Sequence, residues 1–209
     1  MKNQTSNDYK EETRKAYEKF TLKFTEKFAE YLPKYLLMEI EEFAKKIPGR
    51  GKILDVGSGS GDHALFLKNK GFDVFCIDIS PEMIELCKEK GLKAKVMDLE
   101  KLQFQPKSFD AVWAYTSLLH IPKSNLNSVL KKIKETLKPN GIFFIGMKKG
   151  AGEGFVSENK YPGVKRWFSL FSDEELRDFL ELYFIIESHS ETKVDDEHVF
   201  LNYLCRSGD

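Results

Sequence analysis

The feature that most constrains the fold of this 209-residue chain is a glycine-rich segment, DVGSGSGD, at residues 55–62. An apolar run leads into the segment, and a helical pattern begins directly after it at His63. Glycine is needed where the backbone turns sharply after a strand or where a ligand presses against it. The segment therefore predicts a strand–turn–helix unit of an α/β sheet, with a turn that binds a ligand.

The rest of the chain continues this alternation. Apolar runs predict strands at 53–56, 72–77, 94–97, 109–114 and 142–147. Amphipathic stretches predict helices at 63–70, 80–90, 124–137 and 172–181. Two closing strands, 182–186 and 199–204, have no helix between them and predict an antiparallel hairpin at one edge. Repeated βα units predict a doubly wound, mostly parallel, seven-stranded sheet of the Rossmann-like α/β class, with helices on both faces.

The first fifty residues predict helices. Aromatic residues recur there at three- and four-residue steps, as they would along one helical face: Tyr17, Phe20, Phe24, Phe28 and Tyr31. Pro33 interrupts this pattern, and Pro48-Gly49 ends it. The length suits a single domain. We expect a helical cap over 1–50 on a Rossmann-like core over 51–209.

Composition excludes several classes of protein. Lys+Arg and Asp+Glu both number 33, so no net charge attracts nucleic acid or an anionic membrane. No apolar run approaches the roughly 18 residues of a membrane helix. The three cysteines form no CxxC pair, and the four histidines have no metal-ligand spacing. We expect a cytoplasmic protein without a metal and without a nucleic-acid partner.

Acidic residues follow three successive predicted strands. Asp78 lies roughly 20 residues beyond the glycine loop, where a carboxylate accepts both hydroxyls of a ribose. Asp98 is suited to an adenine amino group, and Asp55 to a cationic ligand. The spacing is GxGxG, and Asp62 in the sixth position would repel the pyrophosphate of a dinucleotide. These features favour a nucleoside-containing, positively charged ligand.

Together these segments resemble class I S-adenosylmethionine-dependent methyltransferases. ILDVGSGSG resembles the first motif of that family, and FDAV with SLLH resembles its fourth-strand motif. LKPNG resembles the turn before strand five, with Asn140 as a mild departure. The resemblance covers residues 17–206 and implies S-adenosylmethionine as the cofactor, with these residues as candidate contacts: Tyr17, Asp55, Gly57, Ser58, Gly59, Gly61, Asp78, Ile79, Asp98, Leu99 and Tyr115.

The resemblance also implies methyl transfer by in-line displacement, in which positioning of the reactants is the main catalytic effect. His120 is the candidate general base, because the pKa of a histidine suits neutral pH. Lys148 and Arg166 are candidates to bind an anionic group of the acceptor. His63 is expected to have no role, and residues 149–165, polar and glycine-rich, to form a mobile loop or lid.

The sequence does not identify the methyl acceptor. Residues 114–117 read Ala-Tyr-Thr-Ser, without the Asp/Asn-Pro-Pro-Tyr/Phe motif of DNA amino-methyltransferases or the Pro-Cys of cytosine-C5 enzymes. A small molecule is the favoured acceptor. An RNA or protein substrate, and a protein that binds S-adenosylmethionine without turnover, are the alternatives. A weaker alternative is an NAD-dependent oxidoreductase. Oligomeric state is left open.

Overall fold

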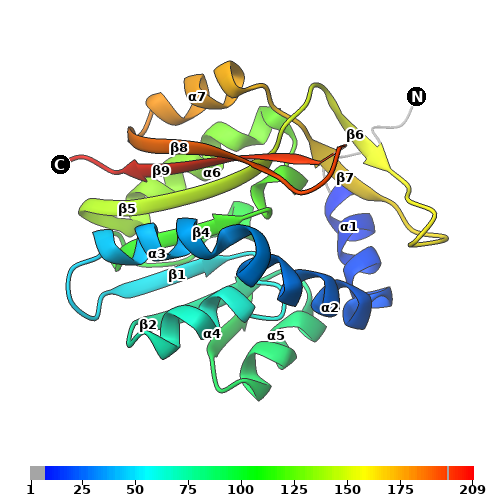
Figure 1. Cartoon of the computed structure of the whole chain (residues 1–209), viewed down its shortest axis with the longest axis horizontal. Coiled ribbons are helices and arrows are strands. Elements are labelled where there is room, and N and C mark those ends of the chain that lie inside the picture. The colour runs from blue at the N-terminus through cyan, green and yellow to red at the C-terminus, as the bar shows by residue number, and fades with distance from the viewer. Residues whose placement is uncertain (1–7, 197) are drawn as a thin grey trace.

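A seven-stranded sheet with the strand order β3-β2-β1-β4-β5-β9-β8 runs through the molecule (Figure 1). The structure is a computed structural model that describes residues 8–196 and 198–209. The sheet strands are β1 (Lys52–Val56), β2 (Asp73–Asp78), β3 (Lys93–Val96), β4 (Phe109–Tyr115), β5 (Leu137–Lys148), β8 (Ile185–Lys193) and β9 (Val199–Arg206). β1 to β5 are parallel, and β9 pairs antiparallel with both β5 and β8. The predicted doubly wound sheet and its antiparallel edge are confirmed.

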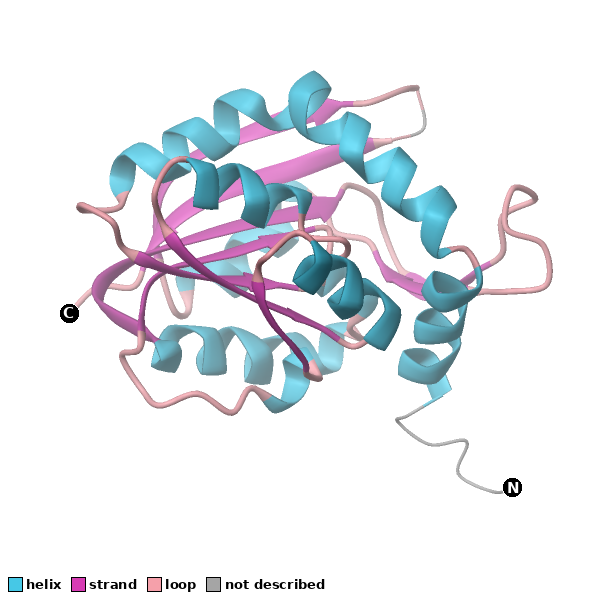
Figure 2. Ribbon diagram, turned by 90° about the horizontal axis from the view of Figure 1, so that it is seen from below, coloured by secondary structure: helices cyan, strands magenta, loops and turns pink. Residues whose placement is uncertain are grey.

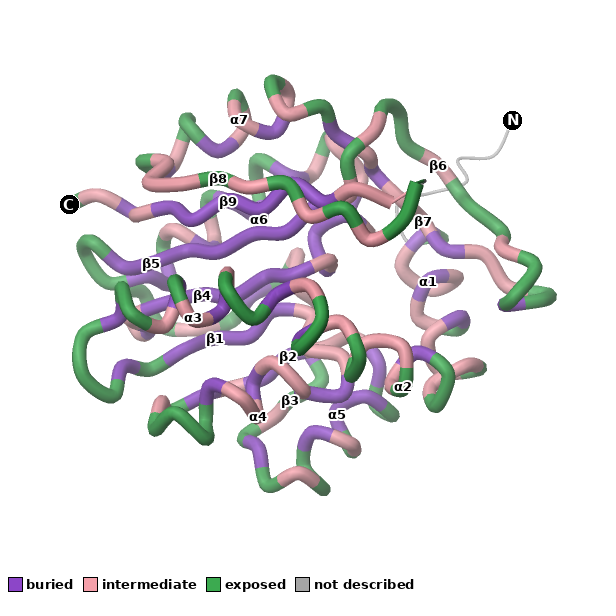
Figure 3. The backbone as a smooth tube through the Cα atoms, in the orientation of Figure 1, coloured by how far each residue is buried: buried purple, intermediate pink, exposed green. Residues whose placement is uncertain are grey.

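Helices cover both faces of this sheet (Figure 2). They are α3 (Leu37–Lys46), α4 (Asp62–Asn69), α5 (Pro81–Glu89), α6 (Lys123–Thr136) and α7 (Asp173–Glu181), with short 3-10 turns η2 (Leu99–Lys101) and η3 (Leu118–His120). Strand residues alternate between the two faces. Ile53 packs with α3 and α4, whereas Leu54 packs with α6 and α7. The central strands are therefore buried along most of their length (Figure 3).

The N-terminal segment forms α1 (Asp8–Lys19) and α2 (Thr21–Tyr31), followed by a π-helical turn, η1 (Leu32–Leu36), that leads into α3. Pro33 lies in this turn. Proline has no N–H to donate to the regular helical hydrogen-bond pattern, so the pattern changes here, as the sequence predicted. Residues 1–7 of the predicted cap lie outside the described part of the chain. No helix in the described part is long and apolar enough to cross a membrane.

Three regions differ from the sequence prediction. The predicted loop at 149–165 contains β6 (Glu153–Val156), which pairs antiparallel with β7 (Arg166–Ser169). Arg166 therefore begins a strand and does not lie in a loop. The predicted strand at 182–186 is β8, which begins later and extends to Lys193. The predicted turn at 139–141 lies within β5, where the pairing with β4 skips from Leu137 to Ile142.

The hairpin of β6 and β7 lies beside α1 at one end of the sheet (Figure 1). The Trp167 N–H of β7 donates a hydrogen bond to Thr13 Oγ1 of α1 at 3.0 Å. The Ser169 hydroxyl donates to the Ile121 carbonyl at 2.6 Å, which joins the hairpin to the segment after β4. These contacts hold α1 and the hairpin over the carboxyl ends of the parallel strands, where open α/β sheets bind ligands.

Candidate functional site

The glycine loop connects β1 to α4, and each of its three glycines has a positive φ. A Cβ atom on Gly57 would lie 2.3 Å from Ser117 Cβ, and one on Gly61 would lie 2.6 Å from Leu92 Cδ1. A Cβ atom on Gly59 would meet nothing within 4 Å. Gly57 and Gly61 are thus required by packing, whereas Gly59 borders open space in the pocket.

Asp78 ends β2 and is bonded to the same loop. Its Oδ2 accepts the Gly59 N–H at 3.0 Å, and its Oδ1 accepts the Ser80 N–H at 2.9 Å. Burial raises the pKa of this carboxyl above its ordinary value, and the backbone hydrogen bonds oppose that shift. Each oxygen keeps a further lone pair, so the carboxylate can accept two hydroxyl donors from a ligand in the pocket.

Asp55 lies beneath the loop rather than in the pocket wall. The residue is 2% exposed, and its Oδ2 has no hydrogen-bond partner among the described residues. Burial, together with the nearby Cys87, Asp78 and Asp62, raises the pKa of this carboxyl well above its ordinary range. A buried carboxylate without a partner is costly, so Asp55 favours a positive charge above it.

Asp98 follows β3 and is held by α1. Its Oδ2 accepts the Lys10 ammonium at 2.7 Å, and Lys10 also lies 3.1 Å from Glu100. Tyr9 donates its hydroxyl to Glu100, and Asn125 donates to both at 3.3 Å. An adenine amino group that approaches Asp98 must therefore share this carboxylate with Lys10.

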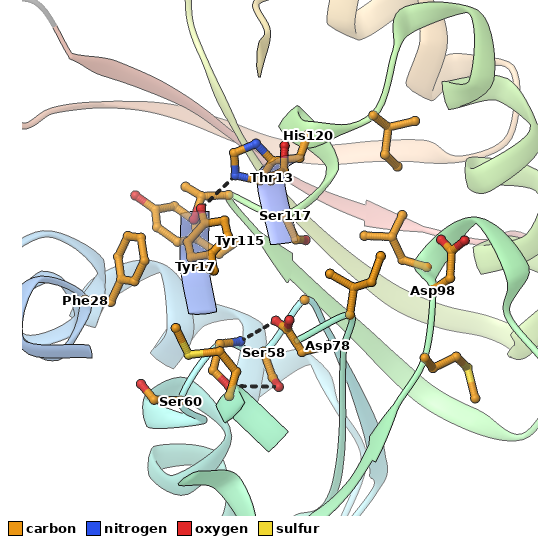
Figure 4. A pocket seen from close by; sticks show the side chains of 18 of the residues that line it. Thr13, Tyr17, Phe28, Ser58, Ser60, Asp78, Asp98, Tyr115, Ser117 and His120 are labelled. Atoms are coloured by element: carbon orange, nitrogen blue, oxygen red, sulfur yellow. Dashed lines mark hydrogen bonds between the residues drawn. The ribbon is translucent and has the colours of Figure 1, made fainter. Parts of the chain in front are cut away.

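Tyr17 and His120 face each other on the opposite side of the pocket (Figure 4). The Tyr17 hydroxyl lies 2.7 Å from His120 Nε2, and His120 Nδ1 lies 2.5 Å from the Trp167 carbonyl oxygen. A carbonyl only accepts, so Nδ1 carries the proton and Nε2 accepts the Tyr17 hydroxyl. Burial, assisted by the positive charge of Arg166, lowers the pKa of His120 to about 3. His120 is therefore neutral at physiological pH and a weak base, so the prediction of a general base with a pKa near neutrality is not supported at this position.

Arg166 lies behind this pair. It is 6% exposed, forms an ion pair with Glu158, and donates through Nη1 to the Tyr17 hydroxyl at 3.3 Å. Its guanidinium lies 4.8–5.5 Å from the centres of four aromatic rings, those of Tyr17, Phe24, Tyr161 and Phe168. The charge of Arg166 is thus already committed to partners within the chain.

Most of the predicted site residues line one pocket: Tyr17, Gly57, Ser58, Gly59, Asp78, Ile79, Asp98, Leu99, Tyr115 and His120. Four predicted residues do not line it: Asp55, Gly61, Lys148 and Arg166. No group of described residues has the His, Cys, Asp and Glu side chains to hold a metal ion.

Several lining residues were missed by the sequence analysis: Tyr9, Lys10, Thr13, Phe28, Tyr31, His63, Met83, Met97 and Glu100. The aromatic spacing of the N-terminal helices was the available signal for Phe28 and Tyr31. His63 is also more than a helix residue without contacts, because Trp113 Nε1 donates to its Nδ1 at 3.1 Å. Burial lowers the pKa of His63 to about 4.

Comparison with known proteins bears on this site. The model of a family described as "Methyltransferase domain" matches residues 54–145, which include the glycine loop, Asp78, Asp98 and His120. A sarcosine/dimethylglycine N-methyltransferase of Aphanothece halophytica is 37% identical over 108 residues, which is 47% of this chain and 38% of that protein. The UbiE ubiquinone/menaquinone biosynthesis C-methyltransferase of Rickettsia massiliae is 33% identical over 133 residues, 56% of this chain and 53% of that protein. The chain thus spans about half or less of these relatives.

Solved structures share the fold at lower identity. A Burkholderia thailandensis 1,6-didemethyltoxoflavin-N1-methyltransferase, with its acceptor and S-adenosylhomocysteine bound, has a TM-score of 0.77 at 16% identity, covering 100% of this chain and 93% of that one. A SAM-dependent methyltransferase of Methanosarcina mazei has a TM-score of 0.71 at 20% identity, covering 78% and 95%. Residues 54–145 thus match the family described as "Methyltransferase domain", and the strand order and these structures show that the chain has the fold of S-adenosylmethionine-dependent methyltransferases.

Proposed function

We propose that the protein transfers a methyl group from S-adenosylmethionine to a small-molecule acceptor. The observation that carries this proposal is the position of Asp78. Its carboxylate is bonded to the glycine loop at 3.0 Å and has free lone pairs in a pocket that Tyr17 and His120 close from the other side. The pocket can therefore hold a nucleoside on the side of Asp78 and a reacting group on the side of Tyr17 and His120.

The pocket fits the cofactor at three points. Gly59 leaves space where any side chain would intrude. Asp55, beneath the glycine loop and outside the pocket lining, has a buried oxygen without a partner among the described residues, and a positive charge of the cofactor above the loop would stabilise its ionised form. Ser117 Oγ, next to the loop, is likewise buried without a partner among the described residues. Asp78 would hold the ribose, and Asp98 with Ile79 and Leu99 would border the adenine.

The cofactor supplies an activated methyl group, so the protein mainly has to position the acceptor and accept its proton. In the structure His120 Nε2 is occupied by the Tyr17 hydroxyl. An acceptor bound against Tyr17 would donate a hydrogen bond to the phenolic oxygen, whose own proton is held by Nε2. With a pKa of about 3, His120 positions the phenol and does not take up the proton, and the Trp167 carbonyl holds the imidazole in the tautomer that accepts this bond. His120 therefore acts through Tyr17.

A small-molecule acceptor is supported by the relatives, which are named for sarcosine and dimethylglycine and for quinone biosynthesis. The balanced net charge supports the absence of a nucleic-acid partner. The free cysteines, Cys76, Cys87 and Cys205, support a cytoplasmic location. RNA or protein acceptors, and binding without turnover, are the competing possibilities.

The test begins with calorimetry. S-adenosylmethionine and S-adenosylhomocysteine should bind at micromolar level, about −8 kcal/mol, and NAD should not compete. A panel of small metabolites is then screened for release of S-adenosylhomocysteine. Binding without turnover on small molecules, RNA or protein would favour the non-catalytic possibility. Binding of NAD without S-adenosylhomocysteine would overturn the proposal.

A further inference from the structure

Two lysines beside the pocket lack the partners that their neighbours have. Lys149 forms an ion pair with Glu191 at 2.6 Å, and Lys160 forms one with Glu158 at 2.8 Å. Lys27 of α2 and Lys148 at the end of β5 form no ion pair with any carboxylate in the described part of the chain. Both are partly buried. Charged groups that leave water usually gain a counter-charge, so this pair needs an explanation.

Both ammonium groups lie near aromatic rings: Lys27 beside two rings that line the pocket, and Lys148 beside a ring behind His120. Lys27 Nζ is 5.5 Å from the ring centre of Tyr31 and 5.8 Å from that of Phe28, and both rings line the pocket. Lys148 Nζ is 6.0 Å from the ring of Phe168, which is 4.9 Å from the ring of His120. The two lysines thus approach the end of the pocket where Tyr17 and His120 lie.

The local charge is unbalanced. Lys27 and Lys148 lie within electrostatic range of Arg166 and Lys160, and Glu158 is already paired with both of the latter. Burial first, and then the neighbouring cations, lowers the pKa of Lys27 to about 8. Burial also lowers the pKa of Lys148, and Glu158 and Asp195 partly oppose that shift. Two carboxylates, Glu158 and Asp195, against four cations leave a surplus of positive charge that an anionic ligand would balance.

We propose that Lys27 and Lys148 bind an anionic group of the methyl acceptor, so that the substrate is a small carboxylate or phosphate whose apolar part packs on Phe28 and Tyr31. This inference rests on the proposed function. The sequence analysis had paired Lys148 with Arg166 as the residues that bind the anionic group. Because Arg166 forms an ion pair with Glu158, we assign this role to Lys27 and Lys148. The anion would lie across the pocket from Asp98 and leave the cofactor side unchanged.

The probe is benzoate, with benzamide as the uncharged molecule of the same shape. Wild-type protein is first titrated with S-adenosylhomocysteine, which tests the proposed function alone. Loaded protein is then titrated with each probe by calorimetry or ligand-observed NMR; if S-adenosylhomocysteine does not bind, the free protein is used. Benzoate should bind at least about tenfold more tightly than benzamide.

Lys27→Met and Lys148→Met keep the length of the side chain and remove its charge. Each should weaken benzoate binding about tenfold and leave the affinity for S-adenosylhomocysteine unchanged. Lys23→Met is the control, because Lys23 is exposed one turn earlier on α2. Equal binding of the two probes, no binding of benzoate below roughly 10 mM, or unchanged benzoate binding by both variants overturns the proposal. A lowered affinity for S-adenosylhomocysteine in either variant also overturns it, because the lysines would then bind the cofactor's own carboxylate.

Discussion

The hydroxyl of Tyr17 donates to Nε2 of His120 across 2.7 Å, although the two residues are 103 positions apart in the sequence. This bond ties α1 to the segment after β4 and closes the reactive end of the pocket. The sequence analysis assigned Tyr17 to the cofactor and His120 to the acceptor. In the structure the two side chains form one unit, so a change in either alters the state of the other.

Removal of either member of this unit should therefore have the same effect. We expect Tyr17→Phe and His120→Asn each to lower kcat on the order of 100-fold, the loss that follows when a group that positions the acceptor is displaced. The double variant should lose no more than the worse single variant, because the residues act together. Initial rates of S-adenosylhomocysteine release with the best acceptor measure this. Multiplicative losses would mean that the two residues act independently.

The glycine loop gives a second prediction. Gly59→Ala should weaken binding of S-adenosylhomocysteine at least about tenfold, since its Cβ would enter the pocket. Gly49→Ala is a matched control, because Gly49 also has a positive φ, 60° against 53°, and open space around it, but does not line the pocket. Both variants should lower the melting temperature by similar amounts, since the strain of a left-handed alanine is alike in both. Equal cofactor affinity in the two variants would contradict a contact at Gly59.

Asp78 gives a third prediction. Asp78→Asn removes the charge and one acceptor, and it should weaken S-adenosylhomocysteine binding at least about tenfold. Asp73→Asn serves as the control, because Asp73 begins the same strand and is exposed, with Lys93 as its ion-pair partner. Calorimetry on both variants, with circular dichroism to verify folding, separates a ribose contact from a general effect on β2. An unchanged dissociation constant in Asp78→Asn would show that it does not bind the ribose.

The parallel part of the fold is predictable from sequence because each buried strand is a continuous apolar run followed by a helix. β8 was placed too early because it is an edge strand that is polar at every position from Glu187 to Lys193. Ser188 and Ser190 of β8 point toward Glu42 and Glu39 of α3, at 3.2 Å each, so the strand has no apolar signal there. β6 and β7 were missed because contacts with α1 hold them, and strands of four residues each have little pattern of their own.

The cofactor side of the site was predictable to the extent that it is local. The glycines and Asp78 belong to one βαβ unit, so their spacing in the sequence indicates their geometry. The Lys10 contact with Asp98 and the shared surroundings of Lys27 and Lys148 join segments far apart in the chain. No periodicity marks such pairs, because long-range contacts depend on how the N-terminal helices pack on the sheet.

The last prediction concerns acid stability. His63 and His120 have pKa values of about 4 and about 3 in the folded protein, against an ordinary value of 6.5, because both are buried. Between the folded pKa values and pH 6.5, these two histidines are therefore protonated in the unfolded chain but neutral in the folded protein. The stabilisation is fully present above pH 6.5 and is lost as the pH falls toward 4 and 3. For His63 alone, the free energy of unfolding should fall by about 3 kcal/mol once the pH is below its folded pKa.

Urea unfolding at pH 7.0 and at pH 5.0 measures this loss. The free energy of unfolding of the wild type should fall over this interval. His63→Gln should fall less, because it removes one titrating group while its amide can still accept the Trp113 N–H. His189→Gln is the control for the removal of a histidine, since His189 is exposed on the edge strand β8. Equal slopes for wild type and His63→Gln would mean that His63 is not held neutral by burial, and a steeper slope would mean that it is protonated in the folded state.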